Sequence, residues 1–184
     1  GGVTSAGFHP GTQWWTSNQP VSYKLDSKLG TEAEFKNMVQ QCATAGVGII
    51  ADVVLNQTTG SDVADGDQKG VAGSEYNGST GSYPGFATKQ YSEGITASDF
   101  HSCKKNVSDY TDQKEVQECR LSSMWDFNSE SEKVQDIQSD YLAALWNAGV
   151  RGFRMVAVKH IHLDSMKAIQ EKFAKKIGQK ASDI

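Results

Sequence analysis

Polar and apolar positions alternate with a helical period in the first regular stretch of the chain. The sequence Thr31-Glu32-Ala33-Glu34 forms a capping box, because the Thr31 and Glu34 side chains can each accept a hydrogen bond from an amide at the start of a helix. Gly46 suits the left-handed residue that follows a helix end. Four apolar residues lie between them at helical spacing: Phe35, Met38, Val39 and Cys42. The pattern predicts an amphipathic helix that buries Cys42.

Two runs of apolar and β-branched residues predict strands. Residues 47–55 read VGIIADVVL, and residues 150–158 form a second run, VRGFRMVAV. Such runs are typical of strands that are buried on both faces of a parallel sheet. Two further helical patterns, residues 131–149 and 163–177, flank the second run. Strands that alternate with helices of this length indicate βαβ crossovers and therefore an α/β fold.

Residues 57–128 interrupt this alternation. They are rich in Gly, Ser, Asp, Asn and Thr and show no sustained period. A structureless loop of about 70 residues does not suit a compact domain, so we interpret this stretch as an inserted, irregular lobe. Cys103 and Cys119 flank a polar segment of the kind that a disulfide ties in secreted proteins. With three cysteines in the chain, one thiol is unpaired or pairs with another chain.

Charge and hydropathy exclude several classes of partner. The net charge is −4, the pI is near 5.5, and no basic cluster is present, which argues against nucleic acid and anionic membranes as partners. No apolar run approaches the roughly 20 residues of a membrane span. Glycosylation sequons at Asn77 and Asn106 fit a secreted, extracellular origin.

Three segments resemble blocks of α-amylases of the animal and actinobacterial type, and they occur in the right order. Residues 13–23, QWWTSNQPVSY, resemble the tryptophan-rich segment after the second barrel strand. Residues 51–56, ADVVLN, resemble the third-strand motif Asp-x-Val-x-Asn-His. Residues 152–160, GFRMVAVKH, resemble the fourth-strand motif Gly-Phe-Arg-x-Asp-Ala-x-Lys-His. The inserted lobe lies between the last two blocks, where this family has its calcium-binding domain B.

The resemblance implies a partial (β/α)8 barrel, since a complete one needs roughly 200 residues and typically about 250. We expect residues 1–56 to form the first part of the barrel, with the end of strand two, a helix and strand three. Residues 57–128 would be the domain B-like insertion, and residues 129–184 a helix, strand four and a further helix. Open strand edges invite association, so we expect a homo-oligomer or a second chain that completes the barrel.

The family's catalytic groups are not found in these residues. Its nucleophilic aspartate should stand at position 156, and Val156 has neither a lone pair nor a charge. Its general acid follows strand five and its transition-state aspartate follows strand seven, beyond the matching segments. Two sugar-contacting positions also differ, because a histidine is replaced by Gln57 and a stacking tyrosine by Asn18. Retaining glycosidases need two carboxylates, so we predict a glycoside hydrolase descendant that does not catalyse.

A structural calcium ion joins domain B to the barrel in this family. The resemblance implies four oxygen ligands, which Ca²⁺ prefers: the side chains of Asn56 and Asp126 and the main-chain carbonyls of Gln117 and His160. On the residues alone, Asp126 could instead be a surface carboxylate and Asn56 a turn residue. The other histidines, His9, His101 and His162, lack metal-ligand spacing, and we interpret them as surface or loop residues.

Sugar contacts are implied for two pairs of residues. Trp14 and Trp15 match residues that line the family's glucan cleft, where indole faces stack on sugar rings. The alternative is that they pack in the core beneath domain B. Lys159 and His160 match residues near the leaving group, and the alternative for Lys159 is a solvated charge.

Arg154 hydrogen-bonds the nucleophile in the family and coordinates chloride in its chloride-dependent members, so chloride is a second candidate ligand. Without the aspartate, an unpaired buried charge would be costly. Arg154 should therefore be exposed to solvent, bound to an anion or paired with a carboxylate, and we expect Asp52 to be that carboxylate.

Three functions compete on this sequence. The first is a lectin-like pseudoenzyme, stabilised by calcium, that binds an α-glucan or another carbohydrate. The second is a fragment or subunit of an α-amylase that another chain completes. The third is a protein-interaction module on the same scaffold, with sugar binding lost.

Overall fold

The computed structural model describes residues 14–62 and 66–184. Short helices and strands alternate along the chain. The longer helices are α1 (Glu32–Thr44), α2 (Gln113–Glu118), α3 (Glu132–Asn147) and α4 (Leu163–Lys176). The strands are β1 (Ile50–Val54), β2 (Gln57–Gly60), β3 (Gln68–Lys69), β4 (Glu75–Tyr76), β5 (Met124–Asp126) and β6 (Gly152–Val156). Five 3-10 helices complete the set: η1 (Trp14–Asn18), η2 (Pro84–Phe86), η3 (Ala97–Asp99), η4 (Val158–His160) and η5 (Ala181–Asp183).

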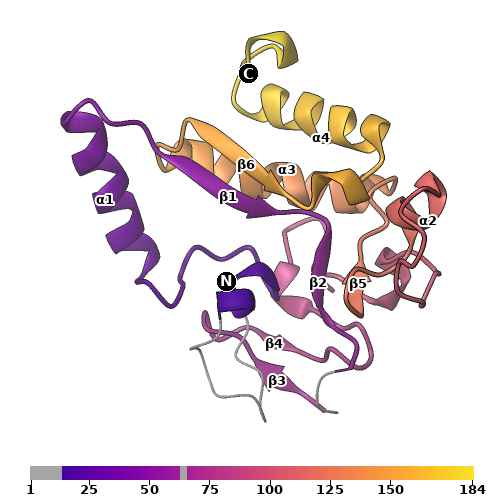
Figure 1. Ribbon diagram of the computed structural model, residues 1–184. Helices are drawn as coiled ribbons and strands as arrows, with labels where there is room; N and C mark the ends of the chain where they lie inside the picture. The colour runs from indigo at the N-terminus through magenta and orange to yellow at the C-terminus, as the bar shows by residue number, and fades with distance from the viewer. Residues whose placement is uncertain (1–13, 63–65) are drawn as a thin grey trace.

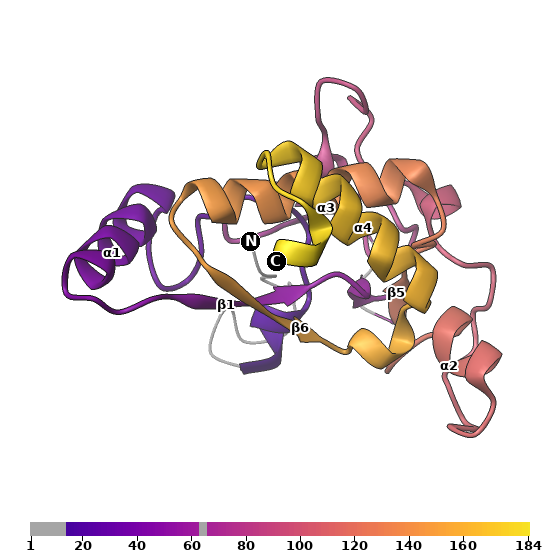
Figure 2. The same ribbon diagram turned by 90° about the horizontal axis from the view of Figure 1, so that it is seen from above.

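The two predicted long strands, β1 and β6, pair in parallel. Their register places Asp52 opposite Arg154 and Val54 opposite Val156. Helices α3 and α4 lie side by side along the same face of this pair (Figures 1 and 2). Apolar residues of β1, α3 and α4 share one core: Val53, Leu55, Leu142, Leu145, Ile169 and Phe173 are among its members. The predicted βαβ arrangement is therefore confirmed for this part of the chain.

The first half of the predicted strand, residues 47–51, differs from the prediction. A strand buried on both faces was expected, but Val47 is 54% exposed and Ile50 is 73% exposed, and only the last residues of β1 are buried. The reason is that β1 pairs with β6 alone among the described strands, so one of its edges has no neighbour. The sequence marks these residues as apolar but does not say which segment covers them.

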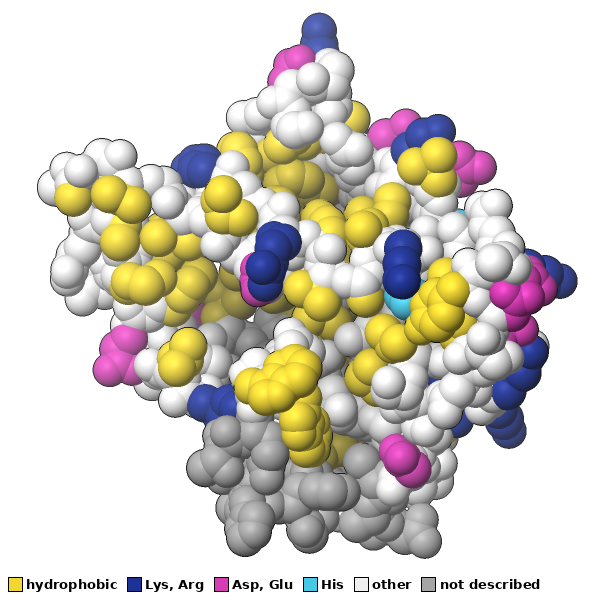
Figure 3. Space-filling model, in the orientation of Figure 1, with side chains coloured by type: hydrophobic (Ala, Val, Ile, Leu, Met, Phe, Trp, Pro, Cys, Tyr) yellow, Lys and Arg dark blue, Asp and Glu magenta, His cyan; other side chains and the backbone are white. Residues whose placement is uncertain are grey.

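Helix α1 forms as predicted but is only partly covered. Its capping box is present, and Gly46 has the left-handed φ of 77° that ends the helix. The helix projects from one end of the molecule, and hydrophobic side chains are exposed around it (Figures 1 and 3). On its apolar face, Val39 is buried, whereas Met38 is 43% exposed. The expectation that Cys42 is buried was wrong: its free thiol is half-buried.

Residues 57–128 supply most of a second core, which is built mainly from aromatic rings. Tyr76, Tyr83, Phe86, Phe100, Trp125 and Phe127 all belong to it. The regular structure is short: β2 pairs with β5, and β3 with β4, both antiparallel. The disulfide between Cys103 and Cys119, expected from the sequence, closes the segment before β5. We call residues 57–128 the lobe.

Helix α3 belongs to both cores. Val134 and Ile137, in its first half, pack with the aromatic rings of the lobe. Leu142 and Leu145, in its second half, pack with β1 and α4. The expected end of barrel strand two falls within residues 1–13, outside the described residues. Among the described residues, no helix has the length and apolarity to cross a membrane.

Candidate functional site

The carboxyl ends of β1 and β6 bring the sequence-predicted site residues together. Because the two strands are parallel and Val54 pairs with Val156, the residues that follow each strand emerge at the same edge. Asn56 and Gln57 follow β1, and the short helix η4 follows β6. In parallel α/β architectures, this is the edge at which ligands bind.

The charged pair of this strand pair is exposed. Arg154 Nη2 donates to Asp52 Oδ2, and the two side chains are 72% and 50% exposed. Their positions are opposite each other in the register, so this is a cross-strand pair. Arg154 is therefore both exposed to solvent and paired with Asp52, as the sequence led us to expect.

Position 156 contributes no chemistry to the edge. Val156 ends β6 and is half-exposed. The next residue, Ala157, has a φ of 55° and a ψ of 28°, a left-handed conformation that is uncommon for a residue with a Cβ atom. This backbone turn directs the chain into η4. Asp52 is the one acidic residue in β1 and β6, and its carboxylate is engaged with Arg154.

The two other substituted positions lie next to each other. Gln57 is buried, and its Nε2 donates to the main-chain oxygen of Asn18 at 3.1 Å. This hydrogen bond ties η1 to the end of β1. Within η1, Trp14 is 78% exposed and Trp15 is half-buried. The Trp14 indole face is thus accessible to a ligand, and the sugar contact itself remains a prediction.

Lys159 and His160 lie in η4 and face different surroundings. The Lys159 ammonium lies 4.4 Å from the centroid of the Tyr110 ring, a cation–π contact at the surface. His160 is 3% exposed, and its Nδ1 lies 2.8 Å from the Val116 carbonyl oxygen. Burial lowers the pKa of His160, so the ring is neutral near pH 7. Its main-chain oxygen, rather than its ring, is the group that can meet a ligand.

Three of the four predicted calcium ligands converge. The Asn56 side-chain oxygen lies 3.2 Å from the His160 carbonyl oxygen and 3.3 Å from Asp126 Oδ1. Three oxygens at such distances repel one another unless a hydrogen atom or a cation lies among them. A turned Asn56 amide would supply hydrogens, and a hard cation would satisfy all three oxygens. The residues present therefore fit a calcium ion.

The carboxylate in this cluster is deeply buried. Asp126 is 2% exposed, and burial raises its pKa to about 6, although His101 acts in the opposite direction. A buried carboxylate of this kind is stabilised by a nearby positive charge. Gln117, the fourth predicted ligand, is buried in the last turn of α2, and its side-chain amide donates to the Ile161 carbonyl oxygen at 3.4 Å.

A chain of ionisable groups that the sequence did not indicate extends from Asp126. Asp126 Oδ2 lies 2.6 Å from His101 Nδ1, and His101 Nε2 lies 3.0 Å from Glu130 Oε2. The other Glu130 oxygen lies 2.9 Å from His162 Nε2. Burial lowers the pKa of His101, but the two carboxylates outweigh burial and hold this pKa above its ordinary value.

His101 and His162 lie in irregular segments, as the sequence led us to expect, but their meeting with Glu130 was not expected. The His101 side chain is only 10% exposed, and both rings meet at Glu130. No spacing signal could have found the cluster, because its members come from three distant segments. The third histidine of that interpretation, His9, lies outside the described residues.

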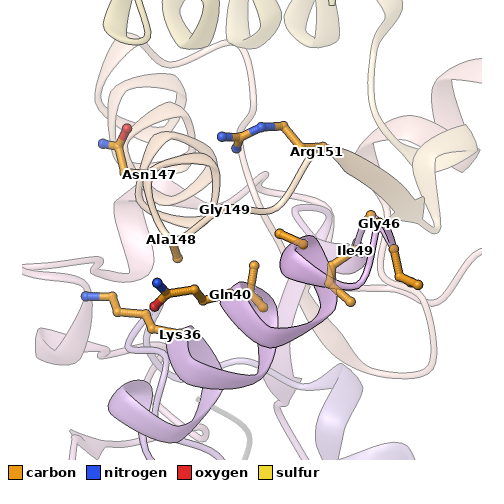
Figure 4. Close-up of a pocket in the computed structure, with 12 residues that line it drawn as sticks. Lys36, Gln40, Gly46, Ile49, Asn147, Ala148, Gly149 and Arg151 are labelled. Carbon is orange, nitrogen blue, oxygen red and sulfur yellow. The ribbon is translucent and has the colours of Figure 1, made fainter.

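Two hollows lie outside the cluster of Asn56 and Asp126, and the second reaches Asp52 and Val54 of β1. One, of about 670 Å³, separates α1 from the end of α3, where Lys36 and Gln40 face Asn147 and Gly149 (Figure 4). The other, of about 730 Å³, is lined mainly by apolar side chains from residues 20–31, α1 and β1. Neither is lined by Val156, Asn56 or Asp126, so neither belongs to the cluster described above.

Comparisons with known proteins agree with the geometry. Residues 12–181 match the family model described as alpha amylase, catalytic domain. The chain is 40% identical over 161 residues to an alpha-amylase-related protein of Drosophila ercepeae, covering 87% of this chain and 30% of that protein. It is 41% identical over 157 residues to an alpha-amylase of Thermomonospora curvata, covering 85% of this chain and 24% of that protein.

A solved structure is similar as well. Wild-type alpha-amylase I from Eisenia fetida superposes with a TM-score of 0.78 at 34% identity, covering 86% of this chain and 31% of that one. A mutant of the same Eisenia fetida protein has been solved as a complex with maltohexaose. The chain thus spans between about a quarter and a third of the length of these relatives.

Proposed function

The chain belongs to the α-amylase family, and from that premise we propose that it binds α-glucans without hydrolysing them and is stabilised by calcium. The observation that carries the proposal is the contrast at one sheet edge. Val156 ends β6 where the family has its nucleophile, whereas Asn56, Asp126 and the His160 carbonyl converge beside it. The groups that we propose for calcium binding are present, and the group for chemistry is replaced by Val156.

Hydrolysis with retention needs two carboxylates about 5 to 5.5 Å apart, one as nucleophile and one as acid. Valine cannot attack an anomeric carbon or stabilise an oxocarbenium ion. Asp52 is the carboxylate of the β1–β6 pair, and it is neutralised by Arg154. These observations support a binding role for the strand ends of this chain.

Calcium would act here as a structural tie. The Asn56 side chain, Asp126 and the carbonyls of His160 and Gln117 would hold it. These groups come from the end of β1, from β5, from η4 and from α2. Bound there, the ion would supply positive charge to a buried carboxylate and join the lobe to the strand ends. A secreted location is part of the proposal, since a disulfide such as Cys103–Cys119 persists in oxidising compartments.

The glucan contacts we propose lie on the exposed side of the same edge. Trp14 presents its indole to solvent, and a pyranose C–H face stacks well on such a ring. Trp15 beside it, and the exposed charges of Lys159 and Arg154, would serve sugar hydroxyls. Chloride at Arg154 is a weaker part of the proposal, because Asp52 already neutralises its guanidinium.

Isothermal titration with maltoheptaose tests the proposal. We expect saturable binding by the chain in calcium and weaker binding after chelation. Trp14→Ala should abolish the heat, and Leu29→Ala, which truncates another highly exposed side chain, should not. A chelated sample that binds equally well would separate the calcium site from the glucan site. Absence of heat from the folded chain in calcium would overturn the proposal.

One observation favours a second candidate, a subunit that another chain completes. Apolar side chains are exposed at the start of β1, just before it and on α1: Ile50, Val47 and Met38. Sedimentation analysis over a range of concentrations would detect a homo-oligomer. If the chain is strictly monomeric and folds cooperatively, a homo-oligomer is ruled out. The partner would then have to be a different protein, either a chain that completes the barrel or the target of a protein-interaction module.

A further inference from the structure

Three side chains from distant segments meet beside the lobe. His101 follows η3, Glu130 lies between β5 and α3, and His162 is the residue before α4. One ligand atom from each of the three lies within 4.8 Å of the other two. Each Glu130 oxygen faces one imidazole nitrogen, at 3.0 Å for His101 Nε2 and 2.9 Å for His162 Nε2. An ion held by these atoms would link three parts of the chain.

The orientation of His101 is fixed from its other side. Its Nδ1 lies 2.6 Å from Asp126 Oδ2, within a largely buried environment. When Nδ1–H donates to that carboxylate, the lone pair of a neutral ring is on Nε2, which points toward Glu130. A carboxylate behind a ligating histidine is the common outer shell of protein metal sites, because it sets the tautomer and raises the basicity of the ring.

The second imidazole nitrogen, His162 Nε2, can also bind an ion, for a different reason. His162 Nε2 is shielded from solvent and has no well-aligned hydrogen bond, although Glu130 Oε1 is close to it. Its lone-pair direction is therefore not taken up by the carboxylate. Glu118 Oε1 lies 3.8 Å from the same nitrogen and offers one more oxygen at the rim.

From this arrangement we propose that His101, Glu130 and His162 bind one divalent transition-metal ion of the zinc type. Two imidazole nitrogens and a carboxylate are donors that such ions prefer, whereas Ca²⁺ takes oxygen ligands. The site is thus distinct from the oxygen cluster of Asn56 and His160. Asp126 stands between the two, with Oδ1 toward Asn56 and Oδ2 toward His101. The proposal does not depend on glucan binding.

The ion would serve as a structural cross-link. It would join the segment of the lobe that follows η3, at His101, to the start of α3 and the start of α4. The competing occupant of this space is a proton shared between the rings and Glu130, which would hold the same three groups together without any metal.

The test is a titration of the complete, metal-free chain with Co²⁺ and then Zn²⁺, in excess calcium so that the oxygen cluster does not compete. We expect one Co²⁺ per chain, with visible d–d absorption typical of nitrogen ligands, and displacement of Co²⁺ by Zn²⁺. His162→Asn should weaken Zn²⁺ binding by at least about tenfold, as should Glu130→Gln. Asn is a preferred N-cap residue, so the first substitution keeps the start of α4.

Glu132→Gln is the matched control, since it removes a carboxylate two residues from Glu130 that ion-pairs with Lys172 instead. It should leave Zn²⁺ affinity unchanged, and circular dichroism should show that each variant is folded. A folded wild-type chain that takes up no Co²⁺ or Zn²⁺ would overturn the proposal in favour of the shared proton. Equal Zn²⁺ affinity in the wild type and in both ligand variants would overturn it too.

Discussion

Two groups of polar residues, one in the middle of the β1–β6 pair and one beyond the end of β1, differ in burial. The Asp52–Arg154 pair is exposed, with half or more of each side chain in solvent. Asn56, two residues after β1, and Asp126, the last residue of β5, are each 2% exposed. An exposed ion pair contributes little to stability, whereas an uncompensated buried carboxylate is costly. A substitution in the exposed pair should therefore cost little stability, and a substitution that leaves the buried cluster unbalanced should cost more.

Removal of the Asp126 carboxylate should have the largest effect, a loss of stabilisation by calcium. Calcium at about 100 times its Kd should stabilise the chain by about 2.7 kcal/mol, or about 5–10 °C in Tm for a domain of this size. Asp126→Asn should abolish this shift, because it removes the one full negative charge of the cluster. Differential scanning calorimetry with calcium and with a chelator measures it.

Asp164→Asn is the control for that experiment, since the Asp164 side chain is 95% exposed and ion-pairs with Lys167 instead of a member of the cluster. It should keep the calcium shift in full. An equal shift in Asp126→Asn would show that calcium binds elsewhere.

Glu115 extends the comparison to a carboxylate of the lobe. The pKa of Glu115 is lowered from the ordinary 4.5 to about 2. The main cause is the hydrogen bond from Lys105, and the amides of Ser108 and Asp109 act in the same direction. A lowered pKa means that the carboxylate stabilises the fold above pH 4.5, and this contribution is lost as the pH falls from about 4.5 to about 2. Glu115→Gln should be less stable at neutral pH and should show a flatter stability profile through that range.

Urea unfolding at a series of pH values checks this prediction. Glu171→Gln, a change on the exposed side of α4, should keep the wild-type profile. Parallel profiles for Glu115→Gln and the wild type would mean that the contacts of Glu115 do not persist in solution.

The exposed pair should give a smaller effect. Asp52→Asn and Arg154→Ala should each leave the urea midpoint of unfolding close to that of the wild type, because solvent screens an exposed ion pair. A double-mutant cycle, measured by urea unfolding, should show little coupling between the two side chains. A large coupling would place this pair with the buried cluster and remove the contrast.

Val156→Asp should have no effect on activity: we expect the 184-residue chain with this substitution to hydrolyse no starch. The substitution restores one carboxylate, and retention requires two. A reducing-sugar assay against soluble starch measures this. Hydrolysis above the wild-type background would reveal a second carboxylate in this chain that acts as the acid.

Local elements followed well from the sequence, and their environment did not. The capping box at Thr31, the left-handed Gly46 and the apolar period predicted α1, because each signal acts within a few residues. The exposure of Met38 and Ile50 was not predictable, since it depends on which distant segment packs against them. An apolar side chain favours burial, but the sequence does not indicate which element will cover it.

The candidate site divides in the same manner. Asn56 and Asp126 could be proposed because each lies in a segment that resembles the family, residues 51–56 for Asn56 and residues 119–126 for Asp126. The structure places the Asn56 side-chain oxygen 3.3 Å from Asp126 Oδ1. His101, Glu130 and His162 could not, since ligands from three segments leave no short spacing. His101 and Glu130, for example, are separated by 29 positions. Buried polar clusters of this kind emerge only when the chain is folded.

Helix α3 sets a condition for exchanging parts between amylases. Its first half completes the aromatic core of the lobe through Val134 and Ile137, and its second half belongs to the strand–helix core. A chimera cut at residue 128 would leave the donor lobe without two of its packing partners. A transplanted lobe therefore has to include the first two turns of α3. The same boundary would constrain recombination between related genes during evolution.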